Sequence, residues 1–251
     1  MSDAKRERSW QAGPLRIRVT LPEEAAAPPK ERLTVERIVD TAMALMAEQG
    51  YDAVSMRSLA KALGTGPASL YAHVANREEL DQLVIDRIVA EVEIPEPDPD
   101  RWEEQLKDLL RSMLSVYRAH PGSARAATAI IPTGVNSVRA MEGLLGIMLA
   151  GGVSAQAAAW FCDLSALYVG AIAVEEQIWM ERVNSTAAGT LPDHEAIDTQ
   201  LTAYFDSLPA DRFPLVTSLA TVMTSGDGED RFGFGIDVLV AGLAAVSEKY
   251  R

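Results

Sequence analysis

The sequence predicts an all-α protein. In most segments apolar residues recur three and four positions apart, which is the spacing of one face of a helix. Residues that favour helix starts and stops bracket these segments; Thr34 precedes one periodic run and Gly50 follows it. The alternation typical of a strand is confined to residues 15–21, LRIRVTL, and no partner strand is apparent. With 251 residues, the chain has room for one small and one larger domain.

Residues 53–77, AVSMRSLAKALGTGPASLYAHVANR, have the pattern of a helix, a turn and a second helix. Ser55 is placed to cap the first helix. Gly64 follows that helix, where a positive φ is favoured, and Pro67 begins the next helix, where a missing N–H costs nothing. One helix of such a unit can enter the major groove of DNA. Together with the preceding helix, this unit predicts a three-helix DNA-binding domain over residues 33–80.

Charge separates this region from the rest of the chain. Residues 53–77 contain no Asp or Glu, although the whole chain has a formal net charge of −13. Their basic and titratable donors are Arg57, Lys61, His73 and Arg77. Residues 81–251 hold 12 basic and 25 acidic side chains and so account for the whole net charge. A surface that has donors and no carboxylates suits a polyanion.

Residues 1–32 are rich in Arg, Lys, Ala and Pro, and we expect an extended arm. Two interpretations are open. The arm could bind phosphates or the minor groove through Arg6, Arg8, Arg16 and Arg18. It could equally be a solvated tail, because it also carries Glu7, Glu23 and Glu24.

Residues 81–251 are expected to form a larger helical domain for ligand binding and dimerisation. The run IPEPDPD at 94–100 cannot continue a helix, because proline occupies every second position. Asp100 and Glu103 then have the spacing of a capping box. A short helix is expected after residue 122, and the other helices at about 100–119, 136–150, 154–182, 194–207, 214–224 and 229–250, with a loop at 184–193.

The last of these helices has one apolar face that contains glycines. Its members are Phe232, Gly235, Ile236, Leu239, Gly242, Leu243 and Val246. Glycine lowers helix propensity, so a close approach of another helix would explain its presence. Two settings remain open: a bundle formed with a second copy of the chain, and ordinary core packing within one chain.

The apolar stretch at 143–174 is not expected to span a membrane. It is broken by Gly151-Gly152, Gln156 and Asp163, and neither half reaches the ~20 apolar residues that a span requires. We expect two buried helices instead. Since the N-terminus also lacks the apolar segment of a secretory signal, we expect a cytoplasmic protein without a membrane partner.

The sequence contains no arrangement typical of an enzyme. We find no paired acids, no phosphate-cradling glycine loop and no nucleophile with a placed base. The single cysteine, Cys162, excludes an internal disulfide; it is either a reactive thiol or a small packing residue. An enzyme on a helical scaffold is kept only as an alternative.

The run from Ser55 to Leu80, SMRSLAKALGTGPASLYAHVANREEL, resembles the tetracycline-repressor family of bacterial transcription regulators. The resemblance is strongest over residues 33–90. A weaker similarity over 101–250 includes the residue pair 132–133, Pro-Thr, and the run Glu-Glu-Gln at 175–177. The resemblance implies a homodimer whose N-terminal helices bind a palindromic DNA operator. It also implies C-terminal helices that enclose a pocket for a small-molecule inducer, which releases the repressor from DNA.

Carried over by this resemblance, the DNA-facing residues are Arg57, Ser69, Tyr71, His73 and Arg77. Their chemistry agrees with that assignment. Arg57 can reach a guanine edge or a phosphate, Tyr71 can donate to a phosphate, and Arg77 can pair with one. For His73, packing against the following helix is an open alternative.

The departures from the family concern metal binding. Ala127 and Glu93 stand where tetracycline repressors have the histidines that contact the drug and its metal ion. Glu175 matches an acid that assists the metal's water shell, but one acid does not make a site. His120 has no partners at metal-ligand spacing. We therefore expect no metal, no cofactor and no metal–tetracycline inducer.

The candidate inducer pocket is mostly apolar, with Asn136 and Asp163 as possible polar anchors. Its members are Leu109, Met113, Ile131, Pro132, Asn136, Cys162, Asp163, Ala166 and Leu167. Such a lining suits a mostly hydrophobic small molecule, although core packing explains each residue equally well. An architectural DNA-binding protein without a ligand is the alternative function. The large apolar C-terminal region exceeds what dimerisation alone needs, which argues against that alternative.

Overall fold

The computed structural model describes residues 32–127, 130–131, 133–185 and 194–251. Within these residues every regular element is a helix, so the all-α prediction is confirmed. By internal contacts the chain divides into two units, Met1–Leu33 and Thr34–Arg251. The expected arm lies almost wholly outside the described residues, and so do its four candidate DNA-binding arginines, Arg6, Arg8, Arg16 and Arg18. In the first unit only Arg32 and Leu33 are described.

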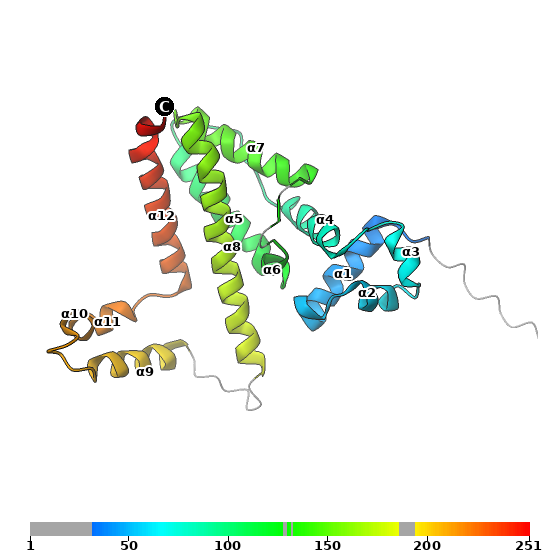
Figure 1. The fold of residues 1–251 in the computed structure, drawn as a ribbon. Coiled ribbons are helices and arrows are strands. Elements are labelled where there is room, and N and C mark those ends of the chain that lie inside the picture. The colour runs from blue at the N-terminus through cyan, green and yellow to red at the C-terminus, as the bar shows by residue number, and fades with distance from the viewer. Residues whose placement is uncertain (1–31, 128–129, 132, 186–193) are drawn as a thin grey trace, which may run out of the picture. The chain divides into compact units, whose positions relative to one another are not determined.

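The N-terminal helices begin and end close to the residues that the sequence predicted. They are α1 (Val35–Gln49), η1 (Tyr51–Ala53), α2 (Met56–Ala62), α3 (Pro67–Tyr71) and α4 (Arg77–Val89) (Figure 1). Thr34 accepts from the amide of Arg37, and Ser55 forms a reciprocal capping box with Ser58. Asn76 caps α4 by accepting from the amide of Glu79 at 2.8 Å. These caps fix where three helices begin, as the sequence pattern indicated.

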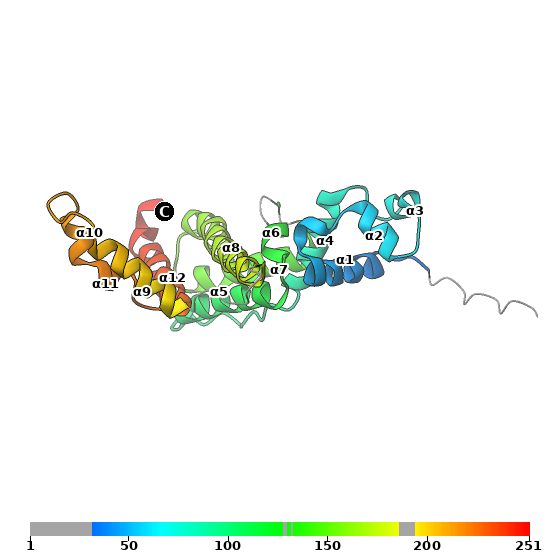
Figure 2. The ribbon, with the colours of Figure 1, turned by 90° about the horizontal axis from the view of Figure 1, so that it is seen from below.

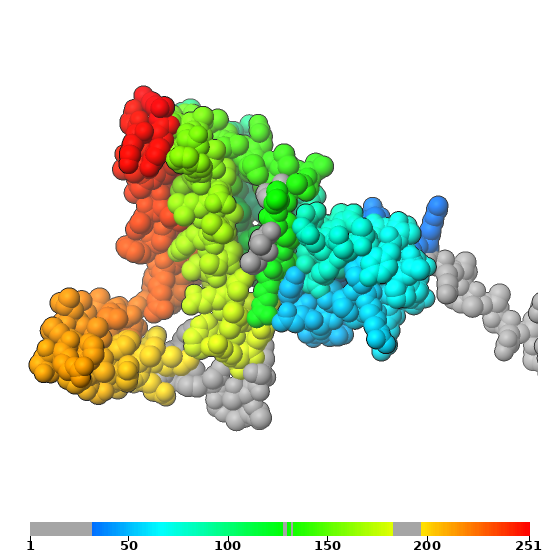
Figure 3. Space-filling model, viewed as in Figure 1, coloured from blue at the N-terminus to red at the C-terminus, as the bar shows by residue number. Residues whose placement is uncertain are grey.

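The remaining helices form the larger part of the fold. They are α5 (Trp102–Ala119), α6 (Ser123–Ala127), α7 (Val135–Ala150), α8 (Ala155–Ser185), α9 (His194–Asp206), α10 (Pro214–Ser218), α11 (Ala220–Met223), α12 (Gly228–Val246) and η2 (Ser247–Tyr250). Helix α5 packs against α7, α8 and α12, and α12 also packs against α8 (Figures 1 and 2). Helices α9, α10 and α11 pack on one another and form a lobe of their own (Figure 3).

Two details of the helix starts differ from prediction. Helix α5 begins at Trp102 after Arg101, and no side chain caps it, so the expected capping box of Asp100 and Glu103 is wrong. The amide of Asp100 instead donates to the side chain of Asp98 at 3.0 Å. The single helix expected over 214–224 is divided into α10 and α11 at Leu219.

Helix α4 joins two apolar cores. Leu80 lies in the first core with Ile38, Leu59 and Leu70, all fully buried. Toward its C-terminal end, α4 packs against α6 and α7. The second core lies among α5, α7 and α12, and its largest fully buried side chains are Leu106, Leu109, Leu110, Leu114, Ile147, Met148 and Phe232. A shift of α4 would therefore change the packing of both cores.

Most of the glycine-containing face of α12 packs within the chain. Phe232, Ile236 and Leu243 are buried, and the ring of Phe232 stacks on Tyr168 with centroids 5.7 Å apart. A Cβ on Gly235 would overlap the hydroxyl of Tyr168, so the expected close approach of two helices is an approach of α8 to α12. For Phe232, Gly235, Ile236 and Leu243, core packing is therefore the correct alternative. Gly242 and Val246, on the same expected face, are exposed, and pairing with a second copy stays open for them.

Helix α8 also carries the apolar segment that raised the question of a membrane span. By length and composition, Ala155–Arg182 could cross a bilayer, with a mean hydropathy of 1.6. The core helix of a soluble protein passes the same test, and α8 packs against α5, α6, α7 and α12. The expected separation of 143–174 into two helices is confirmed, because α7 ends at Ala150 and α8 begins at Ala155. The expected burial is not, because only 33% of the apolar window of α8 is buried within the chain.

Candidate nucleic-acid interface and ligand region

The turn between α2 and α3 orients a short reading helix. Gly64 has a φ of 63°, and the amide of Thr65 donates to the carbonyl of Ala60 at 3.0 Å, which closes the end of α2. Leu70 and Val74 are fully buried and hold α3 against the first core. Because these two residues point inward, the other side of α3 is left facing solvent.

Four of the five residues expected to face DNA are exposed. Ser69, Tyr71 and His73 lie on or just after α3, and Arg57 lies in the first turn of α2. The side chain of Tyr71 is 51% exposed although it is large and aromatic. A hydroxyl, an imidazole and a guanidinium are thus presented on a surface whose sequence contains no acid, and all three can donate to phosphates or base edges.

The fifth residue, Arg77, is held inside the reading head. Its Nε donates to Asp81 at 2.7 Å, and its Nη1 donates to the carbonyl of Val54. Its guanidinium lies over the ring of Tyr51, whose hydroxyl donates to the other oxygen of Asp81 at 2.7 Å. Arg77 therefore anchors the loop before α2 in this structure. Two of its nitrogens are engaged within the chain, and the third, Nη2, is buried without a hydrogen-bond partner.

The Tyr51–Asp81 pair is a part of the site that sequence reasoning missed. Burial raises the pKa of Tyr51, and the hydrogen bond to Asp81 raises it further. Only the four-residue spacing of Arg77 and Asp81 on one helix was visible in the sequence. The contribution of Tyr51, 30 residues away from Asp81, had no local signal.

Helix α6 bridges the reading head and the larger domain. Arg125 donates to Asp52 of η1 and to Glu181 of α8, each at 3.0 Å. Nearby, Nε2 of His120 lies 2.9 Å from a carboxylate oxygen of Glu91, beyond the end of α4. These contacts tie the segment between α5 and α7 to both parts of the fold.

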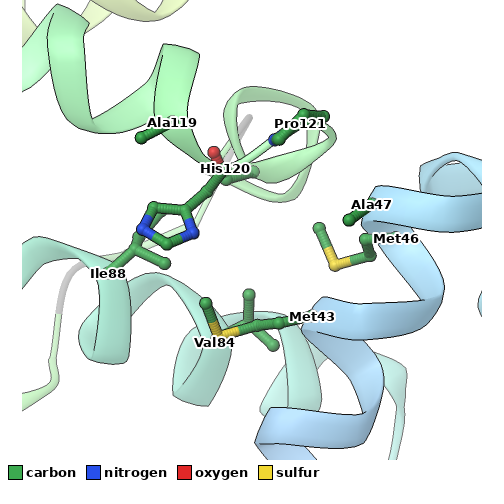
Figure 4. A pocket seen from close by; sticks show the side chains of 9 residues that line it. Met43, Met46, Ala47, Val84, Ile88, Ala119, His120 and Pro121 are labelled. Carbon is green, nitrogen blue, oxygen red and sulfur yellow. The ribbon is translucent and has the colours of Figure 1, made fainter.

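A small pocket lies at the same junction. Met43 and Met46 of α1, Val84 and Ile88 of α4, and His120 at the end of α5 point toward it (Figure 4). Its volume is about 50 Å³, whereas pockets for organic ligands hold roughly 300–1,000 Å³. A second cavity of about 10 Å³ is lined by Val89, Val92, Met113, Val116 and Tyr117. Neither cavity has room for an organic inducer.

The structure does not bring the candidate ligand residues into one cavity. Leu109 is buried in the second core, and Met113 lines the smaller cavity. Ile131 is 74% exposed, and Pro132 lies outside the described residues. Nδ2 of Asn136 donates to Asp86 at 3.1 Å, so this expected ligand anchor already has a protein partner.

The candidates on α8 divide between the interior and the outer surface. Cys162 is half-buried, and burial raises the pKa of its thiol to about 11, which favours the packing role over the reactive one. Asp163 and Ala166 are exposed, and Leu167 is 65% exposed. These three side chains lie on an outward face of α8, away from the core of their own chain.

The described residues contain no cluster of three or more His, Cys, Asp or Glu that could hold a metal ion. Ala127 is the last residue of α6, and Glu93 is exposed beyond the end of α4. Neither position carries a histidine, the residue with which tetracycline repressors contact the drug and its metal ion there.

A helix-turn-helix with exposed donors, joined through one helix to a larger helical domain, defines a DNA-binding transcriptional regulator. Residues 38–82 match the family model for bacterial regulatory proteins of the tetR family, and residues 94–247 match the tetracyclin repressor-like C-terminal domain. Because the second match alone covers more than half of the chain, the chain belongs to the tetracycline-repressor family. Members of this family are DNA-binding regulators and not enzymes, so the predicted family and the predicted lack of catalysis agree with the comparison.

Individual relatives agree with this assignment. The HTH-type transcriptional repressor DrrR1 of Streptomyces coeruleorubidus is 28% identical over 225 residues, which is 89% of this chain and 82% of the relative. The crystal structure of apo ActR from Streptomyces coelicolor is 40% identical and covers 90% of this chain and 100% of its own, with a TM-score of 0.75. ActR in complex with actinorhodin is 39% identical, covers 88% of this chain and 100% of its own, and has a TM-score of 0.77.

Proposed function

We propose that this repressor acts in the cytoplasm and binds a palindromic operator as a homodimer. A small, mostly apolar molecule releases it from the operator. The observation that carries the proposal is the pairing of a solvent-facing reading helix with a large outward apolar surface. The reading helix binds DNA, and the apolar surface is stabilised when a partner covers it. A two-fold dimer satisfies both, since symmetric dimers read two half-sites.

The outward apolar surface lies on α8 and α12. On α8, Trp160, Leu164 and Leu167 are exposed at positions i, i+4 and i+7, which share one helix face. On α12, Phe234 and Val238 are exposed, opposite the face that packs on the core. Monomeric proteins rarely leave so many large apolar side chains in contact with water. We assign this surface to pairing with a second copy.

The reading surface is assigned to Arg57, Ser69, Tyr71 and His73. Arg77 is assigned an indirect role, because its guanidinium is engaged by Asp81 and Val54. It fixes the position of α2 relative to α4 and so aims the other four residues. We place the boundary of the DNA-binding domain near residue 80, within α4, and the ligand-binding and dimerisation domain after it.

The inducer is proposed to bind in the larger helical domain near α5, α7 and α8. ActR has been crystallised with actinorhodin, and its chain is 39% identical to this one over nearly its whole length. Actinorhodin is therefore the first compound to test. Because the cavities described above are too small, we expect the site to open, or to be completed by the second chain, when a ligand binds.

One set of measurements tests the proposal. The full-length chain is used to select duplexes from a random pool, and the selected duplex is footprinted. Sedimentation gives the oligomeric state, and actinorhodin is added to look for a rise in melting temperature and release of the duplex over one concentration range. A discrete palindrome bound by a dimer supports the proposal. Uniform coating of DNA without ligand response would favour the architectural alternative.

A further inference from the structure

The N-terminus of α7 is capped by a residue from α4. Gly134 occupies the cap position and has no side chain to offer. Instead Oδ1 of Asp86 accepts from the amide of Ser137 at 2.9 Å and lies 3.2 Å from its hydroxyl. Ser137 is the third residue of α7, and its amide is one that an N-cap side chain usually satisfies. Asp86 performs that role from a position 51 residues earlier in the chain.

The contact is built to fit this carboxylate. A Cβ on Gly134 would overlap the side chain of Asp86, so glycine leaves room for the carboxylate to approach. The second oxygen, Oδ2, accepts from Nδ2 of Asn136 at 3.1 Å. A negative charge at a helix N-terminus is also favoured by the helix dipole.

Helix α7 returns the interaction at the same, C-terminal end of α4, a few residues beyond Asp86. Nη2 of Arg139 donates to the carbonyl of Ala90 at 3.2 Å and to that of Val92 at 3.3 Å. Carbonyls at the end of a helix lack partners within the helix, and a cation there is favourable. Each helix thus caps the other, so α4 and α7 are held at two points.

The position of this joint gives it a function. Helix α4 starts in the reading head, where Arg77 anchors the loop before α2 and Leu80 lies in the first core. The N-terminus of α7 lies in the region proposed to meet the inducer, and Asn136 was itself a candidate ligand anchor. A displacement at the start of α7 would act on α4 through Asp86.

We propose that Asp86 couples inducer binding to DNA binding. The cap on α7 is made in the DNA-binding conformation, and the inducer favours a conformation in which it is broken, which frees α4 to move. The inference rests on the proposed ligand-responsive function. A ligand shifts such an equilibrium only by its different affinity for the two conformations, so the coupling is measurable as a ratio of dissociation constants.

The experiment uses the full-length chain, a duplex selected from a random pool, and actinorhodin as the probe. The Kd for the duplex is measured with and without saturating actinorhodin, and the Kd for actinorhodin is measured without DNA. The variants are Asp86→Ala, Asp86→Asn and Gly134→Ala. The control is Asp108→Ala, which removes an exposed carboxylate of α5 that pairs with Arg111.

In the wild type the two duplex Kd values should differ by a factor in the usual range of about 5–150. Asp86→Ala and Gly134→Ala should lower this ratio at least about fivefold while changing the actinorhodin Kd less than about threefold. Asp86→Asn keeps an acceptor for Ser137 and should retain part of the ratio; Asp108→Ala should retain all of it. An unchanged ratio in folded Asp86→Ala and Gly134→Ala proteins would overturn the inference, because a merely structural role lowers stability alone.

A second readout needs no ligand. Hydrogen exchange at Ser137 is compared with and without the selected duplex. The duplex should slow exchange in the wild type and slow it less in Asp86→Asn. The Asn variant also replaces Asp86→Ala in this comparison if the Ala variant does not fold. If actinorhodin does not bind, hydrogen exchange alone tests the inference. An exchange rate at Ser137 of the wild type that the duplex does not change would reject the role of Asp86. If no duplex is selected at all, the proposed function itself fails, and the inference falls with it.

Discussion

The guanidinium of Arg77 lies 4.2 Å from the ring centre of Tyr51. Both side chains converge on Asp81, to which each donates a hydrogen bond of 2.7 Å. The side chain of Arg77 is only 30% exposed, and that of Asp81 is 10% exposed. The arginine that sequence reasoning placed on DNA is therefore part of the internal structure of the reading head.

Removing Arg77 should destabilise the protein. Arg77→Ala leaves the carboxylate of Asp81 with one donor fewer in a poorly solvated position, and we expect a loss of about 1.5–3 kcal/mol. Thermal unfolding of the free protein measures this loss. DNA affinity should fall as well, because the loop carrying Val54 is no longer fixed.

The matched comparison is Arg57→Ala. This side chain is exposed, so the melting temperature should stay within a degree or two while the salt slope of DNA binding falls by about 1. If Arg77→Ala instead leaves stability unchanged and lowers the salt slope, Arg77 contacts phosphate, and the anchoring role is wrong.

A second prediction concerns the contact between α8 and α12. Gly235→Ala places a methyl group against the hydroxyl of Tyr168, which is stacked on Phe232. Overpacking of this kind costs about 1–3 kcal/mol. Gly233→Ala is the control, because its Cβ would meet nothing within 4 Å in the chain. That change should stabilise the helix by about 0.5–1 kcal/mol. Equal melting temperatures for the two variants would contradict the packing described here.

The sequence predicted the local structure well because the signals are local. Thr34, Ser55 and Asn76 are caps whose partners lie three residues away, and Gly64 and Pro67 define a turn by their backbone preferences. Buried positions of α3 also followed from helical spacing. These local signals were enough to predict the fold class and the exposed face of the reading helix.

The long-range part of the site had no such signal. The partners of Asp86 lie 50 and 51 residues away, and Arg125 bridges two residues that lie 73 and 56 positions from it. Helical spacing also does not say which of two apolar faces turns inward, so the inner face of α12 was identified and its outer one missed. Ala166 and Leu167 were assigned to a pocket for the same reason.

The outer face of α12 gives a prediction about assembly. Phe234→Glu should weaken self-association at least about tenfold, because a charge would be buried in an apolar interface. The fold should survive, since Phe234 is 71% exposed in the single chain. Sedimentation measures association, and circular dichroism checks the fold. Ser115→Glu, at an exposed position of α5, is the control and should remain a dimer. A fully dimeric Phe234→Glu protein would place the interface elsewhere.

The last prediction concerns Cys162 and pH. Burial raises the pKa of the thiol from 9.0 to about 11, so in the native protein the thiolate fraction at pH 8 should be about 100-fold below that of the unfolded chain. Alkylation by iodoacetamide should be slower by a similar factor in the native protein than in denaturant. The raised pKa also sets the sign of a stability effect. Between pH 9 and about 11 the unfolded chain releases this proton and the folded chain keeps it, so stability falls as pH rises.

Below pH 9 both states keep the proton, and the thiol adds no pH dependence. Cys162→Ala isolates the effect, because Tyr51, Tyr117 and Tyr168 also have raised pKa values caused mainly by burial and act in the same direction at high pH. Denaturant unfolding is therefore measured for both proteins at pH 7, 9 and 10.5. The wild type should lose more stability than Cys162→Ala between pH 9 and 10.5, and the difference between the two proteins should change much less from pH 7 to 9. Parallel stability curves together with rapid native alkylation would show that the thiol is open to solvent, and the packing role would be wrong.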